Sequence, residues 1–416
     1  MRSDVDVRPI PGNIELDPEF RLLAACSWIA PEPLEEMQRE TIERFRDASL
    51  NWERFAALVE RHRLPGIVFR NVNAHGKGLV PAEVREKLKQ QMLHSWQAAS
   101  AHAGELARLN KAFAGREIDL LPLKGTMLSL RLYNEAGMRQ VRDLDLLVRK
   151  EEVGRASELL KEQGYRQKFP DPKASLAQQE MQFKHARHYE FVQERSGYLV
   201  ELHWRWDMWP LEKSSQLWSN SKTTEWMGSK IRVLEDDALL LTVCDHGAGH
   251  RFSRLKWLSD CVMMLVQQRN SPAENLLALA AAFDMERPLA EVAVLARWLY
   301  GVPLAEELKD LIAREKRATE MAAEALRCLL GPEIGKTPHK NMSVARFAWH
   351  APRYWLRSFR YRKSLRKRSS LRLALQRDFI SPEDFNTVQL SEGWMWLYYP
   401  LRPVFWVLRH LPRAER

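Results

Sequence analysis

A short apolar run at residues 118–123 interrupts a chain whose apolar residues otherwise recur at helical spacing from about residue 20 to residue 113. The run is too short to favour a helix. It ends in Lys124-Gly125, a pair that suits a tight turn. We therefore expect a buried strand that ends in a turn.

Three later segments carry strand patterns. Residues 143–148 alternate and are apolar, and the runs 189–192 and 198–204 are separated by a turn at Ser196-Gly197. Helices are expected between these strands, at residues 126–133 and 151–163. The sequence thus predicts a compact α/β segment from about residue 116 to residue 235.

The whole pattern predicts an α+β fold, in which a small mixed-sheet core is flanked by N- and C-terminal helical regions. Residues 84–113 lack proline and favour one long helix, and the helical pattern returns from residue 236 to about residue 330. The predicted segments are a flexible arm (1–18), an N-terminal helical region (19–115), the core (116–235), a helical domain (236–335) and a basic aromatic C-terminal region (336–416).

The positive charge of the chain is concentrated near its C-terminus. The formal net charge is +10, which favours negatively charged partners. Residues 353–377 contain ten basic residues and no acidic ones, so this segment accounts for the whole excess. With the apolar runs at 394–399 and 404–408, it suits an anionic membrane surface or RNA. The alternative is a helical cap that packs its aromatic residues on the core.

Cysteine usage and hydropathy indicate the compartment. The four cysteines are far apart and form no C-x-x-C pair, so we expect reduced, mostly buried thiols. The sequence shows no signal-peptide pattern and no run of about 18 or more uncharged apolar residues. We therefore expect a cytoplasmic protein, with peripheral contact to a membrane left open.

Three acidic residues form a candidate metal site. Asp143 and Asp145 are two residues apart, which on a strand places both carboxylates on one face. Glu201 lies in an apolar strand, where a charge is costly to bury without a partner such as a metal ion. Mg²⁺ prefers hard oxygen ligands, so these three residues suit it.

These residues also resemble a known family. The chain is similar to the polymerase-beta-type nucleotidyltransferase superfamily and, within it, to a bacterial family of uncharacterised nucleotidyltransferases. The resemblance covers roughly residues 20–270. It is carried by Leu123-Lys124-Gly125, Tyr133, Arg139, the segments 142–148 and 200–204, and more weakly by His246, His250, Leu255, Trp257 and Asp260.

The resemblance implies a nucleotidyltransferase that uses a nucleoside triphosphate and Mg²⁺ or Mn²⁺. Asp143 and Asp145 would bind the metal ions, and Glu201 would complete the site and accept a proton from the acceptor. Gly125 would hold the triphosphate through backbone N–H groups. The acceptor would be a small molecule, a glycan or a peptide. Two features depart from the family pattern: Lys124-Gly125 replaces Gly-Ser or Gly-Gly, and the third acid is Glu rather than Asp.

Other residues near the motif have two interpretations each. Lys124, Arg139 and Arg142 could bind phosphate. The alternatives are an exposed turn lysine and surface charges that balance the aspartates. We expect His203 to point to the opposite strand face from Glu201, which favours a structural or acceptor-side role over a role as metal ligand.

A second group lies in the helical region after the core. His246 and His250 are one turn apart on a helix, so they share a face. With Lys256 and Asp260 they could line the nucleotide or acceptor cleft, although a packed helix pair is the favoured interpretation. Packing is also favoured over base stacking for three tryptophans, Trp204, Trp206 and Trp209.

Two other functions stay open. The fold could serve as a non-catalytic binding or regulatory module that docks on a membrane or on RNA through residues 353–377. Alternatively, the acceptor could be RNA or a protein side chain. Metal-dependent binding of a nucleoside triphosphate separates the enzyme from the non-catalytic module.

Overall fold

The computed structural model describes residues 9–331, except residues 47, 77, 173, 207–210 and 270, together with scattered positions between residues 356 and 408. The basic segment 353–377 lies almost entirely outside the described residues, and Trp209 lies outside them. The predictions made for them therefore stay predictions.

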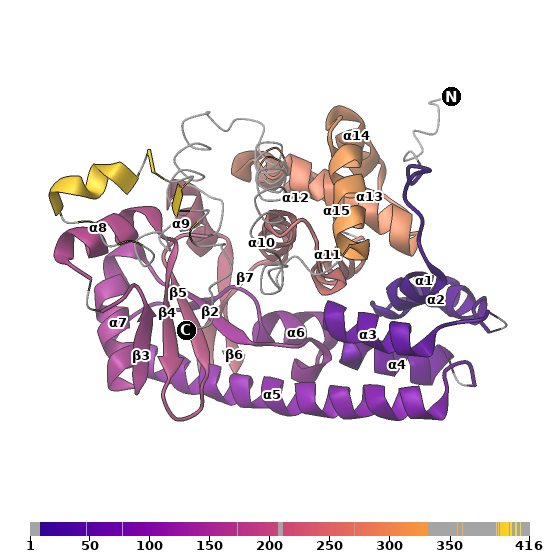
Figure 1. Cartoon of the computed structure of the whole chain (residues 1–416), viewed down its shortest axis with the longest axis horizontal. Helices are drawn as coiled ribbons and strands as arrows, with labels where there is room; N and C mark the ends of the chain where they lie inside the picture. Colours follow the sequence, from indigo (N-terminus) through magenta and orange to yellow (C-terminus); the bar gives the residue numbers. More distant parts are fainter. Residues whose placement is uncertain are drawn as a thin grey trace.

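Helices precede the sheet in the chain. The longest is α5, whose 33 residues confirm the long helix expected at 84–113. In Figure 1 it runs from the sheet to the other N-terminal helices, so one helix supports both parts of the molecule. These helices are α1 (Pro18–Cys26), α2 (Leu34–Glu43), α3 (Trp52–His62), α4 (Pro65–His75) and α5 (Ala82–Ala114).

A mixed five-stranded sheet forms the centre of the core, with strand order β1-β2-β5-β4-β3. Strands β2 and β5 are parallel, and the other neighbours are antiparallel. The expected hairpin of β4 and β5 is confirmed, as is the expected α+β class. The strands are β1 (Leu121–Pro122), β2 (Asp143–Leu147), β3 (Tyr165–Phe169), β4 (His188–Gln193) and β5 (Leu199–His203).

The expected strand at 118–123 is shorter than predicted. Only Leu121 and Pro122 pair with β2, and the Leu123 N–H adds one more bond to the Asp145 carbonyl at 3.1 Å. The chain then turns at Gly125 into helix α6 (Thr126–Tyr133), which was expected. Elements that the sequence patterns did not reveal are β3, helix α8 (Leu176–His185), and a separate hairpin of β6 (Ser221–Trp226) and β7 (Ser229–Leu234).

The two faces of the sheet differ in chemistry. Leu144 and Leu146 of β2 and Val200 and Leu202 of β5 point to one face, where they are buried with residues of α5 and of helix α7 (Val153–Glu162). Burial of these side chains provides the hydrophobic driving force for docking the sheet on α5. The acidic residues at alternate positions must therefore point to the other face.

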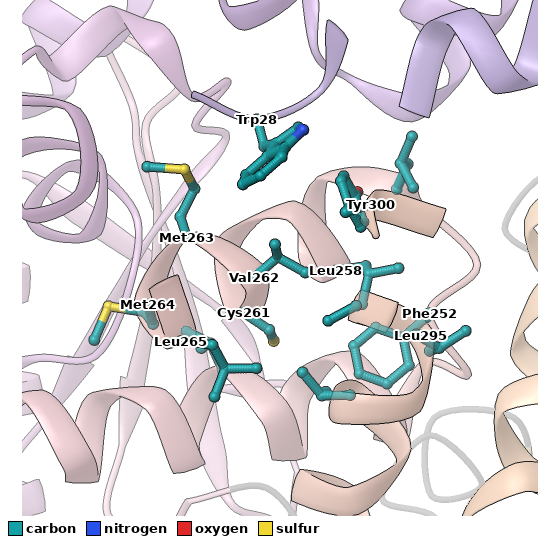
Figure 2. Packing of buried hydrophobic residues seen from close by; sticks show 14 of the residues in the cluster. Trp28, Phe252, Leu258, Cys261, Val262, Met263, Met264, Leu265, Leu295 and Tyr300 are labelled. Carbon is teal, nitrogen blue, oxygen red and sulfur yellow. The ribbon is translucent and has the colours of Figure 1, made fainter. Parts of the chain in front are cut away.

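The C-terminal helices share one core with the N-terminal helices. Trp28, which follows α1, packs edge-to-face on Tyr300 of α13 with ring centroids 5.6 Å apart, and both lie near α11 (Figure 2). This shared core places α10 and α11 close to the polar face of the sheet. The helices that follow the hairpin of β4 and β5 are α9 (Leu211–Ser219), α10 (Asp236–Gly249), α11 (Leu255–Gln267), α12 (Ala273–Phe283), α13 (Glu286–Tyr300), α14 (Glu306–Arg314) and α15 (Ala318–Leu330).

All four cysteines are free and buried, as expected. Among the described residues, no helix is both long enough and apolar enough to cross a membrane.

His62 joins α3 to the start of α11. The ring is fully buried, and its Nδ1 accepts the backbone N–H of Leu255 at 3.0 Å. Burial, and then the charges of Arg61 and Arg254, lower the pKa of His62 to about 3. The folded protein therefore holds this imidazole neutral, whereas the unfolded chain protonates it near pH 6.5.

We predict that this difference makes the fold sensitive to acid. The contribution of neutral His62 to the free energy of unfolding is fully present above about pH 6.5. It is lost as the pH falls towards 3, by up to about 1.4 kcal/mol per pH unit. In His62→Asn the Asn Oδ1 can still accept the Leu255 N–H but does not titrate. The variant should therefore lose less stability on acidification than wild type. Urea midpoints between pH 7 and pH 4.5 measure this, with the exposed His94→Asn as control. Equal pH dependence in wild type and His62→Asn would rule the effect out.

Candidate active site

The strand register brings acidic residues of two strands together. Asp145 of β2 lies directly opposite Glu201 on the parallel strand β5, and Asp143 lies two residues before Asp145 on the same face. Asp145 is 2% exposed, whereas Asp143 and Glu201 are partly exposed. The three carboxylates therefore share the polar face of the sheet, as their spacing predicted.

His203 lies on this face as well, which corrects the expectation that it would point away from Glu201. Residues two apart on a strand point to the same side, so His203 must follow Glu201. Its Nε2 lies 3.2 Å from Glu201 Oε2 and 3.3 Å from Asp145 Oδ1. The imidazole thus links the two carboxylates.

Lys124 neutralises the most buried carboxylate. Its Nζ lies 2.9 Å from Asp145 Oδ1, and its side chain is 12% exposed. Burial alone would lower the pKa of Lys124, but Asp145, Asp143 and Glu201 outweigh burial and raise it. The interpretation of Lys124 as a lysine simply exposed in a turn is therefore wrong.

Glu201 and His203 stabilise each other's charged forms. Burial would raise the pKa of Glu201, but the hydrogen bond with His203 and the nearby positive charges hold it far below its ordinary value. Burial would lower the pKa of His203, but Asp145 and Glu201 raise it. The lysine and the imidazole thus lie against two of the carboxylates of the site.

Gly125 forms the turn between β1 and α6. Its φ of 71° and ψ of −130° are strained for any residue with a side chain, so glycine is required. No side chain caps the start of α6. The first N–H groups of the helix remain suited to an anion.

The two arginines of the motif have different surroundings. Arg139 is buried, and its Nε lies 2.8 Å from Asp260 Oδ2 on α11. Arg142 is exposed beside Asp143. Lys256 is buried nearby and donates to the Gln140 carbonyl oxygen at 3.2 Å. Burial, and then the charge of Arg139, lower the pKa of Lys256 well below its ordinary value.

A small cavity, partly open to solvent, lies between the segments that follow β1 and β5 and the helices α10 and α11. His246 and Asp260, two of the predicted cleft residues, line it, whereas His203, Lys256 and His250 lie beside it. Trp204 and Trp206 are both buried, so the packing expected for them is confirmed. The lining residues are Leu123, Lys124, Arg139, Trp206, Thr242, Val243, His246, Trp257 and Asp260.

Aromatic rings connect the carboxylates to this cavity. Trp206 lies between His203 and His246, with centroid distances of 6.0 and 6.2 Å. His246 in turn contacts Trp257 and His250, at 5.4 and 4.7 Å. Burial, and then the charge of Lys124, lower the pKa of His246 well below its ordinary value, so the ring presents a neutral surface.

Comparison with known proteins identifies the family. A family model described as "Uncharacterised nucleotidyltransferase" matches residues 48–301, which include the sheet, Lys124-Gly125 and all three carboxylates. The chain belongs to this family. The expected family is therefore confirmed, and membership supports nucleotidyl transfer as the general reaction.

Further comparisons add little to the family match. Among solved structures, an antigenic nucleotidyltransferase-like protein from Paracoccidioides brasiliensis matches at 17% identity, over 49% of this chain and 93% of that one. Its TM-score of 0.28 is too low for the likeness to support an argument. A search of curated proteins found no match.

The site residues of this family member fit a hard divalent cation. The Asp143 side chain forms no hydrogen bond or ion pair within the described part of the chain. Both side-chain oxygens of Asp145 are buried and lack a hydrogen-bond donor in good geometry, although Lys124 lies close. With Glu201 they form a set of oxygen ligands, which Mg²⁺ and Mn²⁺ prefer.

The buried ion pair of Arg139 and Asp260 gives a prediction about stability. Arg139→Met leaves the Asp260 carboxylate buried without its closest cation, so we expect unfolding to require about 3 kcal/mol less. The double variant Arg139→Met/Asp260→Leu removes both charges and should recover most of this loss. Urea denaturation measures both.

An exposed pair provides the matched control. Arg116 Nη2 lies 2.8 Å from Glu162 Oε2, and both side chains are about half exposed. Arg116→Met should cost less than about 1 kcal/mol. If Arg139→Met costs no more than Arg116→Met, the buried pair does not stabilise the junction between the sheet and α11.

Proposed function

We propose that this protein is a metal-dependent nucleotidyltransferase. It would transfer a nucleotidyl group from a nucleoside triphosphate to a hydroxyl or phosphate group of a small molecule, a glycan intermediate or a peptide. The observation that carries the proposal is the register of β2 and β5, which sets Asp145 beside Glu201 with Asp143 on the same face. Family membership supports the reaction class.

The three carboxylates are the proposed metal ligands. When Asp143, Asp145 and Glu201 hold Mg²⁺ or Mn²⁺, the cation offsets the negative charge of the triphosphate and makes the acceptor hydroxyl more acidic. Asp145 is oriented for this role by Lys124 and His203. The lowered pKa of Glu201 keeps its carboxylate ionised and so available as a metal ligand. Glu201 would also accept the proton of the acceptor hydroxyl, which the cation makes more acidic.

The triphosphate would bind where β1 ends. Gly125 and the first N–H groups of α6 provide donors, and the Lys124 ammonium provides a positive charge. Arg142, exposed beside Asp143, is a further candidate contact, and Arg139 faces the cavity while paired with Asp260. In the transfer, the acceptor oxygen bonds to the α-phosphorus, the bond from that phosphorus to the bridging oxygen breaks, and pyrophosphate leaves.

The nucleobase or the acceptor would lie against the mouth of the cavity beside Lys124. His246 and Trp257 provide partly exposed ring surfaces there, and Asp260 and Arg139 provide polar groups. Stacking on such rings tolerates different bases and sugars. We further propose that the protein acts in the cytoplasm, and that residues 353–377 provide contact with an anionic membrane or RNA.

The proposal is tested by the binding of a labelled nucleoside triphosphate in the presence and absence of Mg²⁺. Asp143→Asn is the sharpest variant, because Asp143 is partly exposed and has no ion pair whose loss would disturb folding. We expect wild type to bind in a magnesium-dependent manner and Asp143→Asn to lose at least about tenfold in affinity, since a lost metal ligand weakens the whole complex.

Asp119→Asn is the matched control for this experiment. It removes the same charge near β1, at an exposed position that faces Arg149 at 3.5 Å rather than the polar face. Its affinity should equal that of wild type. If wild type binds no better than Asp143→Asn, the enzyme interpretation fails and the non-catalytic module takes its place.

A further inference from the structure

Two histidines meet across the strands next to the carboxylates. His188 of β4 lies directly opposite His203 of β5, with ring centroids 4.9 Å apart. Glu201 lies two residues before His203 and on the same face. One side-chain ligand atom from each of these three residues lies within 4.8 Å of the other two.

Both rings have a buried nitrogen that the described residues do not satisfy. The Nδ1 atoms of His188 and His203 are buried and have no hydrogen-bond partner in this part of the chain. The His203 side chain is 3% exposed and that of His188 is 13% exposed. Burial of an unpaired polar nitrogen is unfavourable, so the arrangement points to a partner that the chain itself does not provide.

A carboxylate lies close to one of the rings. Glu190 Oε1 lies 3.7 Å from His188 Nε2, which is longer than a hydrogen bond. Histidines that bind metal ions commonly donate their second N–H to a carboxylate, which fixes the ring and strengthens the other nitrogen as a ligand. Glu190 is near enough to take this role after a small movement, and the buried Nδ1 of His188 would then face the metal ion.

We propose that His188, Glu201 and His203 bind a divalent first-row transition metal ion of the class of Zn²⁺, Co²⁺ and Mn²⁺. Two imidazoles and one carboxylate, with a further position open to water or substrate, are typical of such sites, whereas Mg²⁺ favours oxygen ligands. Ligand atoms around such an ion are about 3.3 Å apart, so the side chains need to close by only about 1–2 Å.

This site adjoins the three-carboxylate site, because the two share Glu201 and His203 Nε2 lies 3.3 Å from Asp145 Oδ1. Asp143 lies opposite Leu199, at the other end of the polar face from the two histidines. The Asp143 end therefore offers oxygen ligands only, and the His188 end offers nitrogen. The inference does not depend on nucleotidyl transfer, because it rests on ligand geometry alone.

The test is titration of the full-length protein with Co²⁺, followed by its visible absorption and by calorimetry. We expect one equivalent to bind with the absorption of a site that contains imidazole. His188→Gln should weaken binding by more than about 100-fold, since loss of even a second-shell partner costs about 10- to 100-fold. His188 is partly exposed, so this variant should fold, which circular dichroism checks.

Two controls locate the ion. His250→Gln removes half of the rival pair His246 and His250, whose centroids are 4.7 Å apart, and should leave Co²⁺ binding unchanged. Asp143→Asn should also retain Co²⁺ while it loses magnesium-dependent nucleotide binding, which separates this inference from the proposed function. Co²⁺ affinity that survives in His188→Gln, or that is lost in His250→Gln instead, would overturn the proposed site.

Discussion

The buried carboxylate of Asp145 constrains the structure around it. A charge that is 2% exposed must be paired, and its partners come from both neighbouring strands: Lys124 after β1 at 2.9 Å and His203 on β5 at 3.3 Å. Lys124 can reach Asp145 only because the chain reverses at Gly125 in a conformation that favours glycine. The pairing of this one charge thus depends on the turn at Gly125 and on the placement of β2 between β1 and β5.

Packing outside the site holds this arrangement in place. The apolar face of the sheet docks on α5, which extends for about 50 Å and reaches the N-terminal helices. Those helices share a core with α10, α11 and α13, so α11 presents Asp260 to Arg139 beside the sheet. The cavity next to Lys124 is a consequence of this packing, because its walls come from segments next to the sheet strands and from both helices.

Much of the fold could be predicted from local sequence patterns, whereas the contacts that complete the site depend on long-range pairing. Helix α5 and the hairpin of β4 and β5 were predictable from periodicity and turn residues. Strand β3 was not, because the polar Gln167 interrupts the apolar alternation between Tyr165 and Phe169. The position of His203 was available from strand spacing and was predicted wrongly. The pair of Arg139 and Asp260 spans 121 residues, and no local pattern reveals such a contact.

The most direct measurement uses a nucleoside triphosphate labelled at the α-phosphorus in one reaction and at the γ-phosphorus in another. Each reaction contains the protein, Mg²⁺ and cell extract, and the label is followed into the products. Nucleotidyl transfer predicts that label from the α-position appears in an acceptor fraction and that label from the γ-position leaves in pyrophosphate. Asp143→Asn should not transfer the α-label and should not release labelled pyrophosphate. Transfer of γ-label to the acceptor, or equal α-transfer by Asp143→Asn, would contradict the account. Separation of RNA, protein and small molecules then gives the acceptor class.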